Sequence, residues 1–317
     1  MAAQWGVGIA YGATGVIFNL HKTLERHNEM QNTLVLPPLS MAELILDRGV
    51  AYALGHETKA LVAQGWYINP CGGRVDIAAA RDATRRAKVV YRPGMVPAAT
   101  ARIPTATYQT QVYNQTTLAV AQARVAQGYR VAILNFASAT TPGGGWLRGS
   151  RAQEESLARS SALVYAIHDD PWYGDIRHTR NPFYDDTVIV TPQVPFFRAH
   201  MGQLLDQPWY ADVITSAAVH ADAVRRYMPT RTSEIPMVMA KRAQVVLHAA
   251  AMLRADVLVL GAWGCGAFGN NADVVAAALE DAMHQVDLSG YAHVDFAVAD
   301  LRIPAEVLAP FKRRWGK

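Results

Sequence analysis

Residues 142–158 combine three consecutive glycines with two adjacent glutamates. The glycines at 143–145 can adopt positive φ and approach a ligand closely, because no Cβ is in the way. Gln153, Glu154 and Glu155 follow after seven intervening residues. Backbone N–H groups at a glycine loop and at a helix start can bind an anion, and a glutamate there can donate a proton. The sequence therefore predicts a site that holds an anionic ligand and supplies a carboxylic acid.

Two predicted elements would position these residues. Residues 129–135 form an apolar run with the β-branched content of a buried strand. Ser150 and Gln153 have the Ser-x-x-Gln spacing of a capping box, which predicts a helix that begins near Arg151. The glutamates would then lie in its first turn, beside the glycine loop. From the residues alone, two other interpretations stay open: acids that only complement the helix dipole, and glycines that form only a flexible loop.

A second glycine-rich stretch follows the apolar run 255–261 and extends to Asn270. It lacks the Gly-Lys-Ser/Thr of a nucleotide triphosphatase loop, and it does not open a first strand–helix unit as G-x-G-x-x-G does. Phe268 lies in this stretch and could equally be a core residue beside a tight turn. We predict that both glycine loops lie at the same edge of one sheet, where they could hold a diphosphate.

The spacing of the glycines from Gln153, Glu154 and Glu155 resembles the signature of poly(ADP-ribose) glycohydrolases. The flanking segments 134–139 and 160–163 resemble the microbial type of that family. The resemblance covers roughly residues 44–311 and implies hydrolysis of the ribose–ribose O-glycosidic bonds of poly(ADP-ribose), with release of ADP-ribose. It implies that Glu155 is the catalytic acid, which protonates the leaving 2′-oxygen and then helps to activate water. Glu154 would bind the ribose hydroxyls, and Gln153 would buttress the loop.

The resemblance also implies which residues bind the substrate. Phe268 matches an aromatic residue that lies against the ribose near the scissile bond. The chain departs from the family at Thr141 and His220, where many relatives have asparagine, and this leaves the contacts of these two side chains open. The substrate-binding residues implied are Ser138, Gly143, Gly144, Gly145, Gln153, Gly264, Cys265, Gly266, Ala267, Phe268 and Gly269.

The chemistry expected of the two acids differs from that of an ordinary glycosidase. Adjacent helical positions point about 100° apart, so Glu154 and Glu155 cannot be an opposed acid pair. Two adjacent carboxylates repel each other, which helps to keep one protonated near neutral pH. The family implies that the substrate's own diphosphate helps to place the water, with no cofactor and no metal. The alternatives are an ADP-ribose reader without hydrolysis, and a mono(ADP-ribosyl) hydrolase or another nucleotide-sugar hydrolase.

The partners implied are poly(ADP-ribose), ADP-ribose and ADP-ribosylated proteins, in the reversal of ADP-ribosylation that belongs to the DNA damage response. The net charge of +4 gives too weak a field for duplex DNA binding. Arg148, Arg151 and Arg198 could bind phosphate or could be solvated surface residues. Cys71 and Cys265 form no disulfide framework and no paired metal-ligand spacing. We therefore expect an intracellular protein that is not secreted. We also expect the protein to be a monomer.

Composition and the N-terminal stretch set the domain organisation. Hydrophobic residues make up 51% of the 317 residues and charged residues 18%, so the chain is expected to be globular. Residues 2–20 carry no charge, but glycines interrupt them and no positive region precedes them, so they make a poor signal peptide and a marginal membrane span. We predict an N-terminal extension over 1–38 and a catalytic domain over 39–317, with a macrodomain core from about 85 to 317.

Strands alternate with helices across the last two-thirds of the chain, which indicates an α/β fold. The resemblance specifies a macrodomain-like three-layer sandwich, with a mixed central sheet flanked by helices and an N-terminal helical extension. Residues 169–186 are predicted to form a surface loop, and Ser233 is predicted to cap a helix that starts at Glu234. The other predicted helices are 39–65, 116–127, 273–285 and a short one from 304, and the predicted strands are 89–91, 129–135, 187–191, 194–198, 211–219, 255–261 and 291–297.

Overall fold

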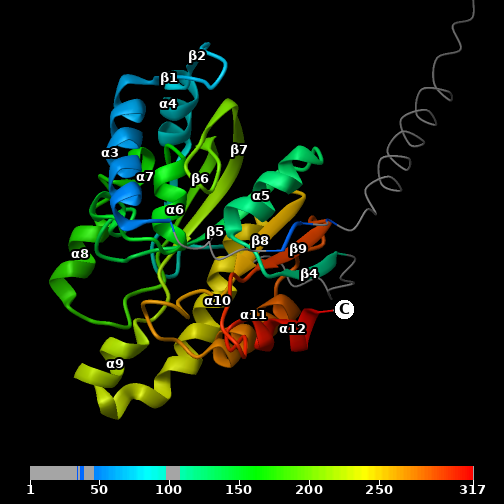
Figure 1. Ribbon diagram of the computed structural model, residues 1–317. Helices are drawn as coiled ribbons and strands as arrows, with labels where there is room; N and C mark the ends of the chain where they lie inside the picture. The colour runs from blue at the N-terminus through cyan, green and yellow to red at the C-terminus, as the bar shows by residue number, and fades with distance from the viewer. Residues whose placement is uncertain (1–33, 35, 39–45, 98–107, 317) are drawn as a thin grey trace, which may run out of the picture. The chain divides into compact units, whose positions relative to one another are not determined.

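The computed structural model describes residues 34, 36–38, 46–97 and 108–316 (Figure 1). The chain divides into two units, Met1–Val35 and Leu36–Lys317, and almost all described residues belong to the second. The predicted extension over 1–38 lies mostly outside the described residues, and the domain boundaries stay a prediction. No helix among the described residues is long and apolar enough to cross a membrane.

A seven-stranded mixed sheet forms the centre of the second unit, in the order β3-β6-β7-β5-β8-β9-β4. Strands β7, β5, β8, β9 and β4 run parallel to one another, whereas β6 is antiparallel to β7 and β3 is antiparallel to β6. This confirms the predicted mixed sheet. Its strands are β3 (Val89–Tyr91), β4 (Gln109–Tyr113), β5 (Val131–Phe136), β6 (Val188–Arg198), β7 (Leu204–Ser216), β8 (Val257–Gly261) and β9 (His293–Ala297), and β1 (Trp66–Ile68) pairs with β2 (Arg74–Asp76) in a separate hairpin.

Helices cover the sheet on both faces, and Figure 1 shows α10, α11 and α12 together on one side of it. β5 is apolar and buried along nearly its whole length, as expected of a central parallel strand covered on both sides. The helices are α3 (Arg48–Gln64), α4 (Ala78–Ala87), α5 (Thr117–Ala126), α6 (Gln153–Ser160), α7 (Leu163–Ile167), α8 (Trp172–Thr179), α9 (Ala221–Tyr227), α10 (Ile235–Ala251), α11 (Ala272–Gln285) and α12 (Leu308–Trp315), with 3-10 turns η1 (Trp146–Arg148) and η2 (Pro229–Glu234).

The prediction for residues 169–186 is wrong, because they contain helix α8. Its Trp172, Tyr173 and Ile176 are buried, so one face of this polar segment packs on the protein. The Asp170 carboxylate accepts a hydrogen bond from the backbone N–H of Trp172 at 3.0 Å and supports the start of the helix. The two prolines in the segment, Pro171 and Pro182, favoured the prediction of a loop, although an eight-residue helix lies between them.

The two strands predicted over 187–198 are one strand, β6, that continues through Pro192. The register against β7 shifts between Thr191 and Val194, and Gln193 adopts a φ of 50° in this bulge. The Asp212 side chain of β7 accepts hydrogen bonds from the backbone N–H of Gln193 at 2.9 Å and from its side-chain amide at 3.0 Å. Proline has no backbone N–H to donate to the neighbouring strand. It is tolerated at position 192 because the regular hydrogen-bonding pattern between the strands is interrupted at the bulge.

Two predicted helix starts also differ from the structure. α3 begins at Arg48, with Asp47 as its N-cap, and residues 39–45 of that prediction lie outside the described residues. α10 begins at Ile235 without a side-chain cap, because the 3-10 turn η2 leads directly into it and Ser233 lies inside that turn. The predictions did not include helix α4, nor the shorter elements β1, β2, β4, α7 and α9.

A buried ion pair ties helix α5 to the sheet. The guanidinium of Arg124 donates from Nε to Asp295 Oδ2 at 2.7 Å and from Nη2 to Asp295 Oδ1 at 3.1 Å. The same Nη2 donates to the Tyr113 hydroxyl at 3.1 Å. The exposed fractions of the Arg124 and Asp295 side chains are 1% and 0%. Burial raises the pKa of Asp295, and the arginine opposes that shift.

We expect Arg124→Met to lower the free energy of unfolding by about 3–5 kcal/mol, because it leaves the Asp295 charge buried and unpaired. Urea denaturation followed by circular dichroism measures this. Arg313→Met is the matched control, since its pair with Asp273 has side chains that are 59% and 54% exposed. The control should change stability by less than about 1 kcal/mol. An equal loss in both variants would contradict a structural role for the buried pair.

Candidate active site

Both glycine loops lie at the same edge of the sheet. β5 and β8 are parallel neighbours, so their carboxyl ends meet there, and the loops follow these ends. A cavity of about 500 Å³ opens at this edge. This confirms the prediction that the two loops share one sheet edge. The predicted site residues that line the cavity are Ser138, Gln153, Glu154, Glu155, Gly264, Cys265, Gly266, Ala267 and Phe268.

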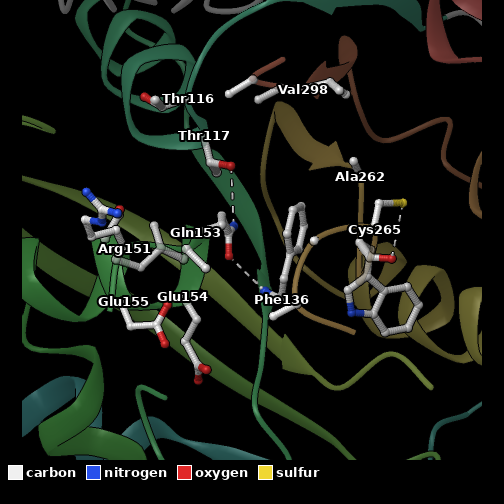
Figure 2. Close-up of a pocket in the computed structure, with 18 of the residues that line it drawn as sticks. Thr116, Thr117, Phe136, Arg151, Gln153, Glu154, Glu155, Ala262, Cys265 and Val298 are labelled. Atoms are coloured by element: carbon white, nitrogen blue, oxygen red, sulfur yellow. Dashed lines mark hydrogen bonds between the residues drawn. The ribbon is translucent and has the colours of Figure 1, made fainter. Parts of the chain in front are cut away.

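Gln153 fixes the start of helix α6 against strand β5. Its Oε1 accepts a hydrogen bond from the backbone N–H of Phe136 at 2.9 Å, and its Nε2 donates to the carbonyl of Leu134 at 2.8 Å. Figure 2 shows this amide between Phe136 and Thr117, with Cys265 across the cavity. Gln153 thus joins the start of α6 to the end of β5, and its predicted buttressing of the glycine loop stays a prediction.

The predicted capping box is wrong. α6 begins at Gln153 with Ala152 in the N-cap position, and no side chain caps it. The Gln153 side chain is occupied by β5 and cannot reach back to Ser150. The two glutamates still lie in the first turn, as predicted, but tertiary contacts rather than a local cap place them there.

Glu154 is held by two backbone donors. Its Oε2 accepts from the N–H of Ser138 at 2.7 Å, and its Oε1 accepts from the N–H of Gly143 at 3.2 Å. The residue is only 4% exposed. Both carboxylate oxygens are therefore engaged within the protein.

Glu155 is held by one backbone donor and has one oxygen to spare. Its Oε1 accepts from the N–H of Gly145 at 2.8 Å. Its Oε2 is buried and receives no hydrogen bond from any described residue. Of the four oxygens of the two carboxylates, Glu155 Oε2 is thus the one without a partner.

Burial controls the protonation of the pair. It raises the pKa of Glu154 well above the ordinary value of 4.5, and the neighbouring negative charge of Glu155 adds to the shift. The N–H groups of Ser138 and Gly143 act in the opposite direction but do not offset burial. Glu154 therefore retains its proton to higher pH than an ordinary carboxyl group.

The three glycines of the first loop hold the acids. The N–H groups of Gly143 and Gly145 bind the two carboxylates, and the N–H of Gly144 donates to the carbonyl of Thr141 at 2.9 Å. Gly144 adopts a φ of 60°, and a Cβ on it would lie 2.3 Å from Glu155 Oε1. Glycine is required here both for the backbone conformation and for the close approach of the carboxylate.

We expect Gly144→Ala to reduce turnover by about a hundredfold or more, because the added methyl group displaces the Glu155 carboxylate and misplaced reacting groups lose rate steeply. The steady-state rate at which the purified variant hydrolyses poly(ADP-ribose) measures this. Gly290→Ala is the control, since a Cβ there meets no atom within 4 Å. Wild-type turnover in Gly144→Ala would show that this contact does not position the acid.

The second loop, residues 262–271, presents free backbone donors. The N–H groups of Gly264, Gly266, Ala267 and Phe268 donate to no other described residue. A Cβ on Gly266 would meet nothing within 4 Å, so the backbone there faces open space. Such consecutive free N–H groups are suited to an anion. The thiol of Cys265 lines the same wall, and burial raises its pKa to about 12, so it stays protonated.

Phe268 is partly buried and packs against the core while also lining the cavity. Its ring is stacked on that of His220, with a centroid distance of 4.6 Å and an interplanar angle of 14°. The ring of Tyr184 lies at 5.9 Å with a tilt of 54°. The two interpretations of Phe268 are thus compatible, since a core residue can still offer one side to the cavity.

The three arginines considered as phosphate ligands separate in the structure. Arg198 is 2% exposed and is used internally: it pairs with Glu57 at 2.9 Å, and its Nε donates to the Thr58 hydroxyl at 3.0 Å. Arg148 and Arg151 are exposed, and Arg151 lines the cavity. Among the described residues, no group of three or more His, Cys, Asp or Glu side chains could hold a metal ion.

The sequence analysis missed one wall of the cavity. Residues 297–302, which follow β9, line it together with Val307. β9 is the parallel neighbour of β8, so its carboxyl end reaches the same edge. The predicted strand 291–297 could have pointed to this part of the cavity. The residues after it, 298–307, carry no glycine pattern that would have marked them as a binding loop.

Comparisons with known proteins show which family the chain resembles. The family model for the catalytic domain of microbial-type poly(ADP-ribose) glycohydrolase (PARG) matches residues 55–199. The Thermomonospora curvata PARG structure is 37% identical, with 84% of this chain and 99% of that chain covered and a TM-score of 0.79. The same enzyme with the inhibitor ADP-HPD is 38% identical, with the same coverage and a TM-score of 0.75. A comparison with curated proteins found no match.

The Deinococcus radiodurans PARG in complex with ADP-ribose is 35% identical, with 74% of this chain and 96% of that chain covered and a TM-score of 0.69. Fold and similarity together define a glycoside hydrolase with a macrodomain-like fold. The chain belongs to the microbial-type poly(ADP-ribose) glycohydrolases.

Proposed function

We propose that this chain hydrolyses the ribose–ribose O-glycosidic bonds of poly(ADP-ribose), with Glu155 as the general acid and base. The main support for this assignment is the state of Glu155 Oε2. This oxygen is buried, receives no hydrogen bond from the described residues, and belongs to a residue that lines the cavity. The other three oxygens of the two carboxylates already accept backbone N–H groups, so this oxygen is the one available to exchange a proton with a substrate. An acid held in this way can donate to a substrate without first breaking an internal bond.

The reaction follows from this arrangement. Glu155 Oε2 gives its proton to the leaving 2′-oxygen while the bond to the anomeric carbon breaks through an oxocarbenium-like transition state. The Glu155 carboxylate then takes a proton from the water that adds to the same carbon. Glu154, held rigidly by two N–H groups, accepts hydrogen bonds from the ribose hydroxyls and fixes the ring near Glu155. Positioning of this kind supplies a large part of the rate.

The second loop binds the diphosphate in this proposal. The free N–H groups at residues 264 and 266–268 support it, and so does the open space over Gly266. The first loop, although predicted to share this role, has its three glycine N–H groups occupied and acts on the acids instead. Phe268 is the last residue of the run with free N–H groups and lines the cavity, which supports a contact of its ring with the ribose next to the diphosphate.

Binding of ADP-ribose in the structure of the Deinococcus radiodurans relative supports the same ligand here. An ADP-ribose reader without hydrolysis would have no use for two buried carboxylates, which cost stability, so their presence favours the enzyme. Poly(ADP-ribose) attached to ADP-ribosylated proteins is the substrate that we expect, at an intracellular site and with a monomeric enzyme.

The decisive variant is Glu155→Gln. It should lower turnover of poly(ADP-ribose) by about 10²–10⁴-fold, because an amide cannot supply the proton. Binding of ADP-ribose, measured by calorimetry, should persist because the second loop is unchanged. Chromatography of the products from labelled polymer gives the rate. Glu306→Gln is the control, with a side chain that is 68% exposed. If Glu155→Gln cleaves the polymer at the wild-type rate, Glu155 is not the acid.

The pH dependence tests the coupling of the two acids. Turnover should fall as the pH rises through the raised pKa of Glu154, because the proton that Glu154 retains beside Glu155 is then lost. The side chain of Glu154→Gln cannot ionise, so we expect this fall to be absent from its pH profile. Because folding raises the pKa of Glu154, its contribution to stability is likewise present at low pH and is lost as the pH rises. A pH profile of kcat that Glu154→Gln does not shift would contradict the coupling.

A further inference from the structure

The ring of Phe268 has an imidazole stacked on it. His220 lies at 4.6 Å with an interplanar angle of 14°, which is the closest and most parallel ring contact that Phe268 makes among the described residues. His220 does not itself line the cavity, whereas Phe268 does. The histidine therefore packs on one face of the phenylalanine ring from outside the cavity lining.

The His220 ring is itself held in a fixed orientation. It occupies the N-cap position of helix α9, and its Nδ1 accepts a hydrogen bond from the backbone N–H of Ala223 at 3.3 Å. Its own backbone N–H donates to the carbonyl of Pro182 at 2.9 Å. Because Nδ1 is an acceptor, the proton of the neutral ring is on Nε2. Burial lowers the pKa of His220, which keeps this neutral form in place.

The same turn of α9 holds the backbone that carries Phe268. The N–H of Asp222 donates to the carbonyl of Phe268 at 3.0 Å. Arg225 donates to Asp222 Oδ1 at 2.8 Å and also to the carbonyl of Gly269. A Cβ on Gly269 would lie 2.3 Å from the Asp222 carboxylate, so the loop is packed closely on this turn. Backbone and ring of Phe268 are thus both fixed from α9.

We propose that His220 is a positioning residue for the reaction, which acts by holding the Phe268 ring against the ribose. This inference rests on the proposed function, because it assumes that Phe268 contacts the substrate. Without the stacked imidazole, the main chain of Phe268 keeps its bond to α9, but the ring is free to change rotamer. A ring that moves by about an ångström no longer orients the ribose, and the loss appears mainly in kcat.

Two variants separate the stack from the cap. His220→Asn keeps a side-chain acceptor at the N-cap but removes the ring. His220→Phe keeps a ring over Phe268 but removes the acceptor. We expect His220→Asn to lower kcat by about tenfold to a hundredfold, and His220→Phe to keep kcat within about threefold of wild type. The opposite order would show that the cap matters and would overturn the proposal, as would wild-type kcat in His220→Asn.

A double-mutant cycle tests whether His220 acts through Phe268. Phe268→Ala alone should cut turnover by about tenfold to a thousandfold, because it removes a group that orients the substrate. Adding His220→Asn to Phe268→Ala should then lower turnover no further, since the phenylalanine ring that the imidazole holds is already absent. If the two losses multiply, His220 acts independently of Phe268 and the proposal fails.

The dissociation constant for ADP-ribose, measured by calorimetry for the four proteins of the cycle and for His220→Phe, distinguishes this failure from failure of the proposed function. If the wild-type protein does not cleave poly(ADP-ribose), the proposed function is lost, and the cycle is then read from ADP-ribose binding alone. In that case we expect weaker binding in His220→Asn than in His220→Phe, with no additional effect on Phe268→Ala. Melting temperatures of all variants show whether a loss comes from unfolding instead.

Discussion

The active site depends on backbone N–H groups that hold two buried carboxylates. Burying a carboxylate is costly unless hydrogen bonds satisfy it, and here Ser138, Gly143 and Gly145 supply three of them. These bonds need a main chain that turns sharply within a few residues and comes close to the acids, which only glycine at position 144 allows. The glycine loop and the acidic helix start are therefore one unit, and neither would be stable in this form without the other.

The two glycine loops differ in what their backbone N–H groups bind. The first satisfies the acids and leaves Glu155 Oε2 as the one oxygen of the two carboxylates that receives no hydrogen bond from the described residues, which is why we propose it as the proton donor. In the second, the N–H groups of residues 264 and 266–268 donate to no other described residue and so are suited to an anion. Parallel pairing of β5 with β8 brings the two loops to one edge, so the acid and the anion site face the same cavity. Chemistry and binding are thus supplied by adjacent strands.

Rigid supports behind the site explain why so much polar structure is buried in this chain. Gln153 fastens α6 to the end of β5, and the first turn of α9 fastens the backbone and the ring of Phe268. Further from the cavity, the Arg124–Asp295 pair fixes α5 against β9. Such supports act by limiting the movement of groups that touch the substrate, and this is the form in which a scaffold contributes to rate.

The sequence by itself determined the mixed α/β class, the central strand, both glycine loops and the two acids, because glycine patterns, apolar runs and the Gln-Glu-Glu spacing are local signals. It could not determine which N–H groups meet which carboxylate, nor that Ser150 does not cap α6, because contacts with β5 decide both. Helix α8, the bulge at Gln193 and the wall at 297–302 were missed for the same reason. The stack of His220 on Phe268 joins residues that lie 48 positions apart in the chain, and only the tertiary fold brings them together.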